Sequence, residues 1–324
     1  MSVESFRESC QRIVGGLRVV KGDYQVIEGA PVTLLEPGLN DRFVYGREAY
    51  GVLRALNRRI GKLEEDEGRL ARVLLGSILV ECSNVIVNGK GRRYRRNWES
   101  RRVSRDDVVQ CFEGAVERAV EDLTKFDRED RTEHAVYTDD ARSKLSSVPS
   151  ADLAIFSPPY PNSFDYTDVY NLELWMLGYF RTATDNANHR ARTLRSHVQI
   201  KWPERRFGTP TPKLARVKKA LEGRRGELWN RNIPEMVVGY FDDLEKVLTS
   251  LKGSIREGAF VVAAVGDSQY GGVKIDTGGI LSEIGERCGY ELEDAMEIRS
   301  MRASWQHGGG FDLAETAIRL RRGA

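Results

Sequence analysis

The sequence predicts an α/β protein, with a helical region in its first part and a β-sheet that contains buried parallel strands in its second part. From Glu48 to Val87, apolar side chains recur every three or four residues, as they do on the buried face of a helix. After residue 131 they form short runs instead, such as Leu153–Phe156, which end in polar residues or proline. The chain has 324 residues, of which 40% are hydrophobic and 30% charged, so it is long enough for both regions.

The helical region is expected to span residues 46–130. Its apolar spacing fits two helices separated near Glu65–Gly68. A third helix is predicted between Asp106 and Phe126, because Ser104 can cap its first turn. Residues 1–45 contain short apolar pieces broken by glycine and proline, and this segment stays unassigned.

The sheet region is expected to span residues 131–324. Three apolar runs are predicted as its buried strands: His134–Tyr137, Leu153–Phe156 and Phe260–Val265. A helix is predicted over Ile233–Leu251, before the last of these strands. Near the end of the chain, Ala295–Arg302 and Ala314–Leu320 predict an antiparallel pair joined through the glycines at 308–310.

Several classes of protein do not fit this composition. No apolar run approaches the roughly 18 to 20 residues that cross a bilayer, and Met1–Gly15 is not a signal peptide, so we expect a cytoplasmic protein without a membrane partner. The cysteines lie far apart, and the histidines have no ligand spacing, so we expect neither disulfides nor a metal site. These residues are Cys10, Cys82, Cys111, Cys288, His134, His189, His197 and His307.

Two stretches are strongly basic although the formal net charge is only +2. The first, Lys90–Arg105, interleaves arginines with aromatic residues and therefore suits phosphate contact and base stacking, although a solvated charged loop is the competing interpretation. The second spans residues 190–225, and its basic excess would fit contacts with a nucleic-acid backbone. An ordinary charged helical insertion is the competing interpretation. The candidate nucleic-acid contacts are Arg92, Arg93, Tyr94, Arg95, Arg96 and Trp98 in the first stretch, and Arg205, Arg206 and Lys213 in the second.

The segment Asp152–Tyr160 carries the clearest chemistry, because an apolar strand ends in the turn Ser157-Pro158-Pro159-Tyr160. The exocyclic amine of cytosine or adenine is a poor nucleophile until acceptors bind its hydrogens. Ser157 Oγ and the Pro158 carbonyl could supply such acceptors, and the two prolines fix the turn. Tyr160 could stack on a base that has left the duplex. An exposed proline-rich turn or peptide ligand is the alternative for so short a pattern.

This turn resembles the fourth motif of the amino-group DNA methyltransferases, in which Asp, Asn or Ser precedes Pro-Pro and an aromatic residue. The resemblance implies a class I, Rossmann-like sheet, S-adenosylmethionine (SAM) as cofactor, and double-stranded DNA with a flipped base as substrate. The serine form favours cytosine N4 over adenine N6. Residues from Asn162 to Trp175 also look like the helix that follows this motif in a bacterial subgroup. Residues at about 185–230 occupy the position of a target-recognition insertion, and the setting would be restriction-modification.

Three residues are assigned to the cofactor by the same resemblance. The segment from Thr138 to Arg142 is similar to the family's third motif, so Asp140 and Ala141 would contact SAM together with Ser157. An N-cap is an equally good interpretation of Asp140. The turn Gly266-Asp267-Ser268 after the predicted strand either lines the base pocket or only turns the chain.

The Gly-rich turn that family members place after their first strand is missing from this sequence. A sheet without its first strands would also expose a long edge, which folded proteins avoid. We therefore expect an incomplete sheet that a second methyltransferase subunit completes in a heterodimer. Two rival functions stay open: an amino-methyltransferase acting on RNA, and a non-catalytic subunit that positions DNA for a partner.

Overall fold

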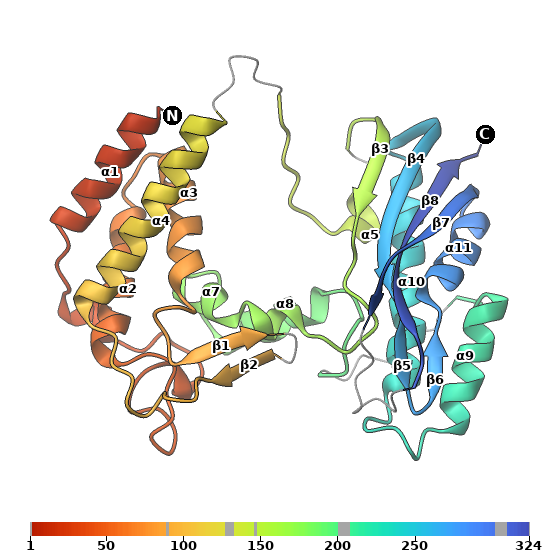
Figure 1. Cartoon of the computed structure of the whole chain (residues 1–324), viewed down its shortest axis with the longest axis horizontal. Coiled ribbons are helices and arrows are strands. Elements are labelled where there is room, and N and C mark those ends of the chain that lie inside the picture. Colours follow the sequence, from red (N-terminus) through yellow and green to blue (C-terminus); the bar gives the residue numbers. More distant parts are fainter. Residues whose placement is uncertain are drawn as a thin grey trace. The chain divides into compact units, whose positions relative to one another are not determined.

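The computed structural model describes residues 2–88, 91–126, 133–145, 148–199, 208–301 and 310–323. The chain forms two compact units (Figure 1). Unit 1 contains Met1–Glu133 and Tyr166–Arg190, and unit 2 contains His134–Asp165 and Ala191–Ala324. Residues 166–190, which we expected in the sheet region, belong to unit 1 because Leu172, Trp175 and Phe180 are buried in its core.

Unit 1 is mainly helical. Its longer helices are α1 (Val3–Gly15), α2 (Arg47–Ile60), α3 (Glu65–Ile78) and α4 (Arg105–Lys125), with short 3₁₀ turns at Lys21–Tyr24 and Val32–Leu34. The three helices predicted after residue 46 are confirmed, but the break between α2 and α3 comes just before the predicted position. Ser104 caps α4 as predicted. Its hydroxyl accepts from the Asp107 amide at 3.2 Å, and the Asp107 carboxylate accepts from the Ser104 amide at 2.8 Å.

Unit 1 also contains a small hairpin and a second group of helices. Strands β1 (Val85–Asn88) and β2 (Gly91–Tyr94) pair antiparallel, so the start of the basic stretch is a strand. The later helices are α6 (Tyr166–Val169), α7 (Asn171–Met176) and α8 (Ala183–Arg192), the last of which ends just inside unit 2.

Unit 2 is built on a four-stranded sheet in the order β3-β4-β8-β7. Its strands are β3 (Ala151–Phe156), β4 (Ile255–Gly266), β7 (Tyr290–Met301) and β8 (Leu313–Arg322). β3 and β4 run parallel, whereas β8 is antiparallel to both β4 and β7. The two predicted strands at Leu153–Phe156 and Phe260–Val265 and the antiparallel pair at the end of the chain are therefore confirmed. The glycines at 308 and 309 lie outside the described residues.

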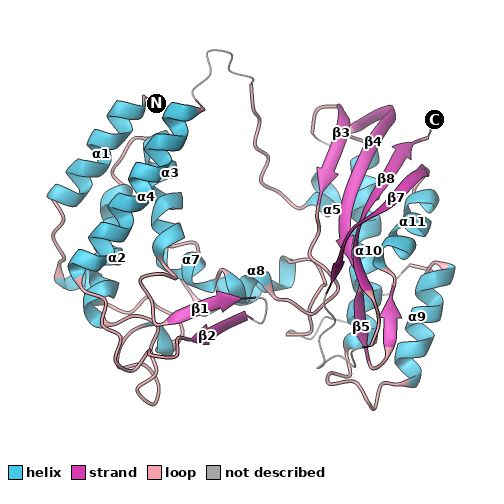
Figure 2. Ribbon diagram, in the orientation of Figure 1, coloured by secondary structure: helices cyan, strands magenta, loops and turns pink. Residues whose placement is uncertain are grey.

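Helices cover one face of this sheet. Helix α10 (Ile233–Lys252), predicted from the sequence, and α11 (Thr277–Arg287) lie behind the strands in Figure 2, with α5 (Ala141–Lys144) and α9 (Pro212–Gly223) also in unit 2. Val261, Ala263 and Val265 on β4 alternate with half-exposed neighbours and are buried in the core that α10 and α11 share. A short hairpin of β5 (Ser268–Tyr270) and β6 (Val273–Ile275) follows β4.

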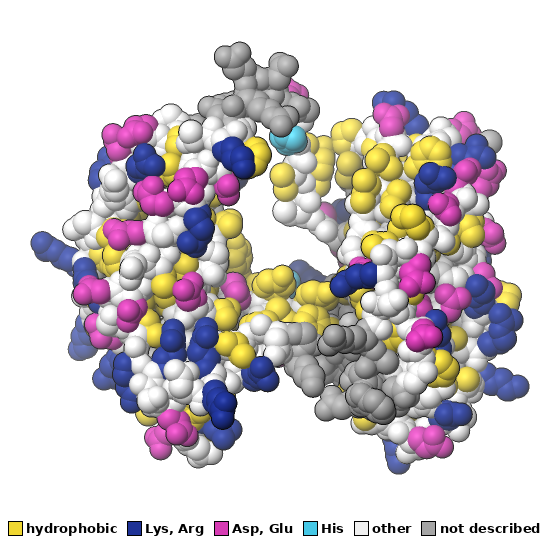
Figure 3. Space-filling model, in the orientation of Figure 1, with side chains coloured by type: hydrophobic (Ala, Val, Ile, Leu, Met, Phe, Trp, Pro, Cys, Tyr) yellow, Lys and Arg dark blue, Asp and Glu magenta, His cyan; other side chains and the backbone are white. Residues whose placement is uncertain are grey.

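The opposite face of the sheet is covered by no described element of unit 2. We expected β3 to be a buried strand, but Leu153 is 50% exposed and Ile155 is 71% exposed. Apolar side chains gather over β3 and β4 in Figure 3. β3 is also an edge strand, because β4 is its single described neighbour.

The strand predicted at His134–Tyr137 is wrong. These residues are in no strand, and Val136 is 87% exposed. An apolar run forms a strand only when another strand satisfies its backbone groups, and the outer edge of β3 is unpaired in the described structure. None of the described helices is both long enough and apolar enough to span a membrane.

Candidate active site

The turn Ser157–Tyr160 lies at the carboxyl end of β3, beside the carboxyl end of the parallel strand β4. This edge of a parallel sheet is where open α/β folds bind their ligands. Ser157 is exposed, and its hydroxyl donates a hydrogen bond to the carbonyl of Ala264 on β4 at 3.0 Å. A serine hydroxyl has one proton and two acceptor lone pairs, so this bond leaves the oxygen free to act as an acceptor.

Tyr160 is held on two sides. Its hydroxyl donates to the carboxylate of Glu315 on β8, which also binds Arg299 on β7. Its ring lies against Gly266 so closely that a Cβ at Gly266 would be 2.6 Å from Cε2 of the ring. A side chain at position 266 would therefore displace the ring. Burial and the hydrogen bond to Glu315 raise the pKa of Tyr160, partly offset by Ser157, so the phenol stays protonated near neutral pH.

Asp267, the residue after Gly266, has a structural role. Asp267 is buried, and its carboxylate accepts from the Thr277 amide at 3.1 Å and binds Lys274 at 3.0 Å. It thereby ties the end of β4 to the start of α11. Within the turn Gly266-Asp267-Ser268, Gly266 lies against the Tyr160 ring.

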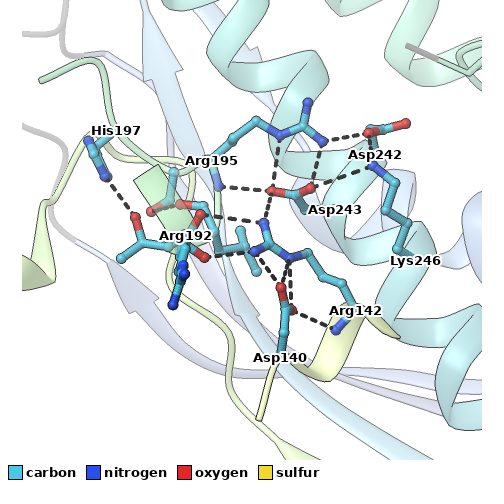
Figure 4. A network of polar contacts seen from close by, with 11 residues as sticks. Asp140, Arg142, Arg192, Arg195, His197, Asp242, Asp243 and Lys246 are labelled. Carbon is cyan, nitrogen blue, oxygen red and sulfur yellow. Dashed lines mark hydrogen bonds and ion pairs between the residues drawn. The ribbon is translucent and has the colours of Figure 1, made fainter. Parts of the chain in front are cut away.

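Asp140 forms the N-cap of α5. Its carboxylate accepts from the Arg142 amide at 3.0 Å and binds the Arg142 guanidinium at 2.7 Å (Figure 4). The hydrogen bond from Arg142 holds the pKa of Asp140 below its ordinary value. Ala141 is the exposed first residue of α5. The contact of Asp140 and Ala141 with SAM stays a prediction.

Arg142 joins Asp140 to a buried network of charges. Its guanidinium binds Asp243 on α10 at 3.1 Å, and Arg195 binds both Asp243 and Asp242 (Figure 4). Lys246 binds Asp242 at 2.6 Å. Arg195, within the second basic stretch, is therefore neutralised inside unit 2 and does not face a nucleic acid.

The other residues of the second basic stretch have mixed positions. Lys213 lies in the first turn of α9, and its amine binds Asp276 at 3.3 Å, with both side chains partly exposed. Its amide donates to Glu283 at 2.9 Å. Arg205 and Arg206 lie outside the described residues.

The first basic stretch is divided between structural and exposed side chains. Arg95 donates to the carbonyls of Val80 and Ser83, each at 3.1 Å, and burial lowers its pKa. Arg93 and Arg96 are exposed, and Arg92 is half-buried on β2.

The two aromatic residues of that stretch pack together. The rings of Tyr94 and Trp98 have centroids 5.2 Å apart, and Trp98 also meets Phe43 at 6.2 Å. This contact restricts the base-stacking role predicted for Tyr94 and Trp98, because each ring already has an aromatic neighbour. These residues belong to unit 1, whereas the Ser157–Tyr160 turn belongs to unit 2.

Sequence reasoning missed three residues around the turn: Arg299, Glu315 and Tyr270. Tyr270 is buried, and its hydroxyl donates to the Pro161 carbonyl at 3.0 Å, which fixes the exit of the turn. The contacts of Tyr160 with Glu315 and of Tyr270 with Pro161 join residues more than 100 positions apart in the sequence, and no local pattern reports such pairs. Within the described parts of the chain, no group of three or more His, Cys, Asp or Glu side chains is placed to hold a metal ion.

Comparison with known proteins gives matches over about half of this chain. It is 32% identical over 157 residues to the Type II methyltransferases M.AvaI of Nostoc sp. and of Anabaena variabilis, covering 45% of this chain and 32% of each relative. It is also 27% identical over 179 residues to the Type II methyltransferase M.BsoBI of Geobacillus stearothermophilus, covering 49% of this chain and 35% of that protein. The chain is related to the Type II DNA methyltransferases.

This relationship agrees with the Ser157-Pro158-Pro159-Tyr160 turn and with the mixed α/β fold. The chain spans about a third of the length of the curated methyltransferases that it matches. No protein-family model matches the chain, and no solved structure matches it significantly.

Proposed function

We propose that this chain carries the target-base pocket of a SAM-dependent DNA methyltransferase that modifies an exocyclic amine, with cytosine N4 preferred over adenine N6. The observation that carries the proposal is the hydrogen bond from Ser157 to Ala264 at the carboxyl end of β3. It leaves Ser157 Oγ as an acceptor in the turn that the Type II methyltransferase relatives lead us to interpret as catalytic.

Two acceptors in the turn would bind the amine. Ser157 Oγ and the Pro158 carbonyl accept its two hydrogens, which draws the nitrogen lone pair out of conjugation with the ring. An amine held in this way could attack the methyl group that SAM would supply. The methylated nitrogen becomes acidic only after this step, so it loses its proton without a dedicated histidine base.

Tyr160 would orient the base. Its ring is fixed between Gly266 and the Glu315 carboxylate, so it can offer a face to a flipped base at little entropic cost. Base stacking on an aromatic ring contributes about 1 to 3 kcal/mol and tolerates different bases. The ring therefore contributes affinity, whereas the two acceptors select for an amine.

The residues of this chain fit the amine better than they fit the whole cofactor. SAM would supply the electrophilic methyl group. Asp140 and Ala141 are the candidates for its adenosine part, but the Asp140 carboxylate is already bound by Arg142. No Gly-rich turn follows an apolar strand in this sequence, so the close backbone donors that SAM's methionine part needs are not supplied here.

The edge of the sheet supports completion by a second polypeptide. In doubly wound sheets of strand order 3-2-1-4-5-6, the strand that carries the Gly-rich turn pairs with the fourth strand, and ligands bind where the order reverses. In such a sheet the parallel pair β3 and β4 would take the places of strands 4 and 5, and the strand with the Gly-rich turn would pair along the open edge of β3. The exposed Leu153 and Ile155 provide an apolar surface for the helices that accompany it.

The test is expression of this chain with its neighbouring open reading frames in a host that lacks the corresponding methylation. We expect N4-methylcytosine in the digested host DNA by mass spectrometry, lost in Ser157→Ala and retained in Ser77→Ala, which changes an exposed serine of α3. N6-methyladenine instead would correct the base preference. Methylation confined to RNA, or unchanged DNA methylation in Ser157→Ala, would contradict the proposal and support one of the two rival functions.

A further inference from the structure

A cavity of about 480 Å³ lies wholly within unit 1 and takes no part in the candidate active site. Its walls include Arg54 from α2, Arg72 from α3 and Arg181 from the segment after α7. Trp175 and Phe180 also line it. The cavity therefore brings together three guanidinium groups that lie far apart in the sequence.

No ion pair or side-chain hydrogen bond joins Arg54, Arg72 or Arg181 to another residue that the structure describes. Asp185 lies near Arg181, but its carboxylate accepts from the amides of Arg181 and Thr182. The acid near Arg54 is Asp23, whose carboxylate is already bound by Arg58 at 2.9 Å and by the Val20 amide at 2.9 Å. Glu28 is the one acidic residue of the lining. Three positive charges and one negative charge leave a net charge of +2.

The guanidinium groups of the three arginines supply the hydrogen-bond donors of this cavity. Donors of this kind, with an excess of positive charge among the lining residues, are suited to an anion with several acceptor oxygens.

The burial of the two aromatic rings favours a phosphate over a base as the ligand of this cavity. Trp175 and Phe180 meet edge to face, with centroids 5.4 Å apart, but they are 0% and 3% exposed. Rings so deeply buried cannot offer a face for stacking. A guanidinium group binds a phosphate through two parallel hydrogen bonds, which the three arginines can provide.

We propose that this cavity binds a phosphate group of the DNA backbone through Arg54, Arg72 and Arg181. The choice of DNA as the source rests on the proposed function, whereas the binding of phosphate does not. Such a contact would be independent of base sequence and would fix the position of the duplex on unit 1.

The experiment measures binding of a random-sequence duplex over a series of salt concentrations, with no methylation readout. Replacing Arg54 and Arg72 together by Ser should weaken binding and reduce the slope of log affinity against log salt by about one. The matched control is Arg69→Ser on α3, which removes an exposed charge paired with Glu65 and should keep the parent slope. A double variant whose log affinity falls with log salt as steeply as that of the parent would overturn the proposal.

A second measurement separates the two sources of phosphate. If inorganic phosphate raises the melting temperature of the parent protein but not of the double variant, while duplex binding is unchanged, the cavity takes free phosphate and the DNA assignment is overturned. If the Ser variant does not fold, Arg54→Lys with Arg72→Lys decides. It should keep the salt slope and bind more weakly, because lysine cannot form the paired hydrogen bonds, and unchanged affinity would contradict the site. If the chain shows these effects but does not methylate DNA, the phosphate site stands and the proposed function is wrong.

Discussion

The hydroxyl of Tyr160 donates a hydrogen bond to the carboxylate of Glu315, so the aromatic ring of the Ser157–Tyr160 turn is held by a strand 155 residues further along the chain. The same carboxylate binds Arg299, and the hydrogen bonds from Tyr160 and Arg299 keep the pKa of Glu315 below its ordinary value. Gly266 on β4 also lies against the ring, so β4, β8 and, through Glu315, β7 together fix the side chain of Tyr160. This is expected of a ring that must meet a base in a defined plane.

Replacing Tyr160 by Ala should lower methylation strongly. Loss of a stacking contribution of about 1 to 3 kcal/mol corresponds to roughly one to two decades in rate. Tyr160→Phe keeps the ring and loses the bond to Glu315, so its defect should be smaller. Initial rates of the complete enzyme on duplex DNA provide the measurement, with circular dichroism to check the fold. A folded Tyr160→Ala variant with the parent's rate would remove Tyr160 from the mechanism.

The arginines of the first basic stretch should separate into two kinds. Arg93→Ser with Arg96→Ser should weaken binding to all DNA sequences and flatten its salt dependence, because both side chains are exposed. Arg95→Ser should instead destabilise unit 1 by about 1 to 3 kcal/mol, because two backbone carbonyls lose their donor. Salt-dependent binding and denaturant unfolding measure the two effects. Equal salt slopes in the parent and the Arg93/Arg96 variant would mean that Arg93 and Arg96 lie in a solvated loop and do not contact DNA phosphates.

The bond between Asp140 and Arg142 should make stability depend on pH. The hydrogen bond from Arg142 lowers the pKa of Asp140 from its ordinary value of 3.8, so the bond stabilises the fold above that value and is lost as pH falls through the lower, folded pKa. Asp140→Asn should melt about 1 to 3 °C below the parent at pH 6, and this gap should close as the pH falls below 3.8. Asp312→Asn, an exposed change elsewhere in unit 2, is the control. A gap that stays constant with pH would exclude this bond as its cause.

Local sequence patterns predicted those helices and strands whose formation depends mainly on neighbouring residues in the sequence. The apolar spacing of α2, α3 and α10 and the Ser104 cap of α4 were sufficient, as was the run Phe260–Val265 that became the centre of β4. His134–Tyr137 was also interpreted as a short apolar run, but it lacks a neighbouring strand, and pairing is not a local property.

The candidate site was predictable in part for the same reason. The turn Ser157–Tyr160 is contiguous, so its residues could be read from the sequence. Gly266 and Glu315 contact Tyr160 only because β4 and β8 place them beside it. Arg95 and Arg195 were grouped with exposed basic residues because composition does not distinguish an arginine in solvent from one bound inside the protein.

We propose that this chain provides the target-base pocket and only part of the cofactor site. Calorimetric titration of SAM into the purified chain tests it most directly, with the titration repeated after addition of the polypeptide that carries the Gly-rich strand. We expect no micromolar binding to the chain alone, and one SAM bound per heterodimer once that strand pairs along the open edge of β3. Micromolar binding of SAM to this chain alone, together with full methylation, would contradict the account.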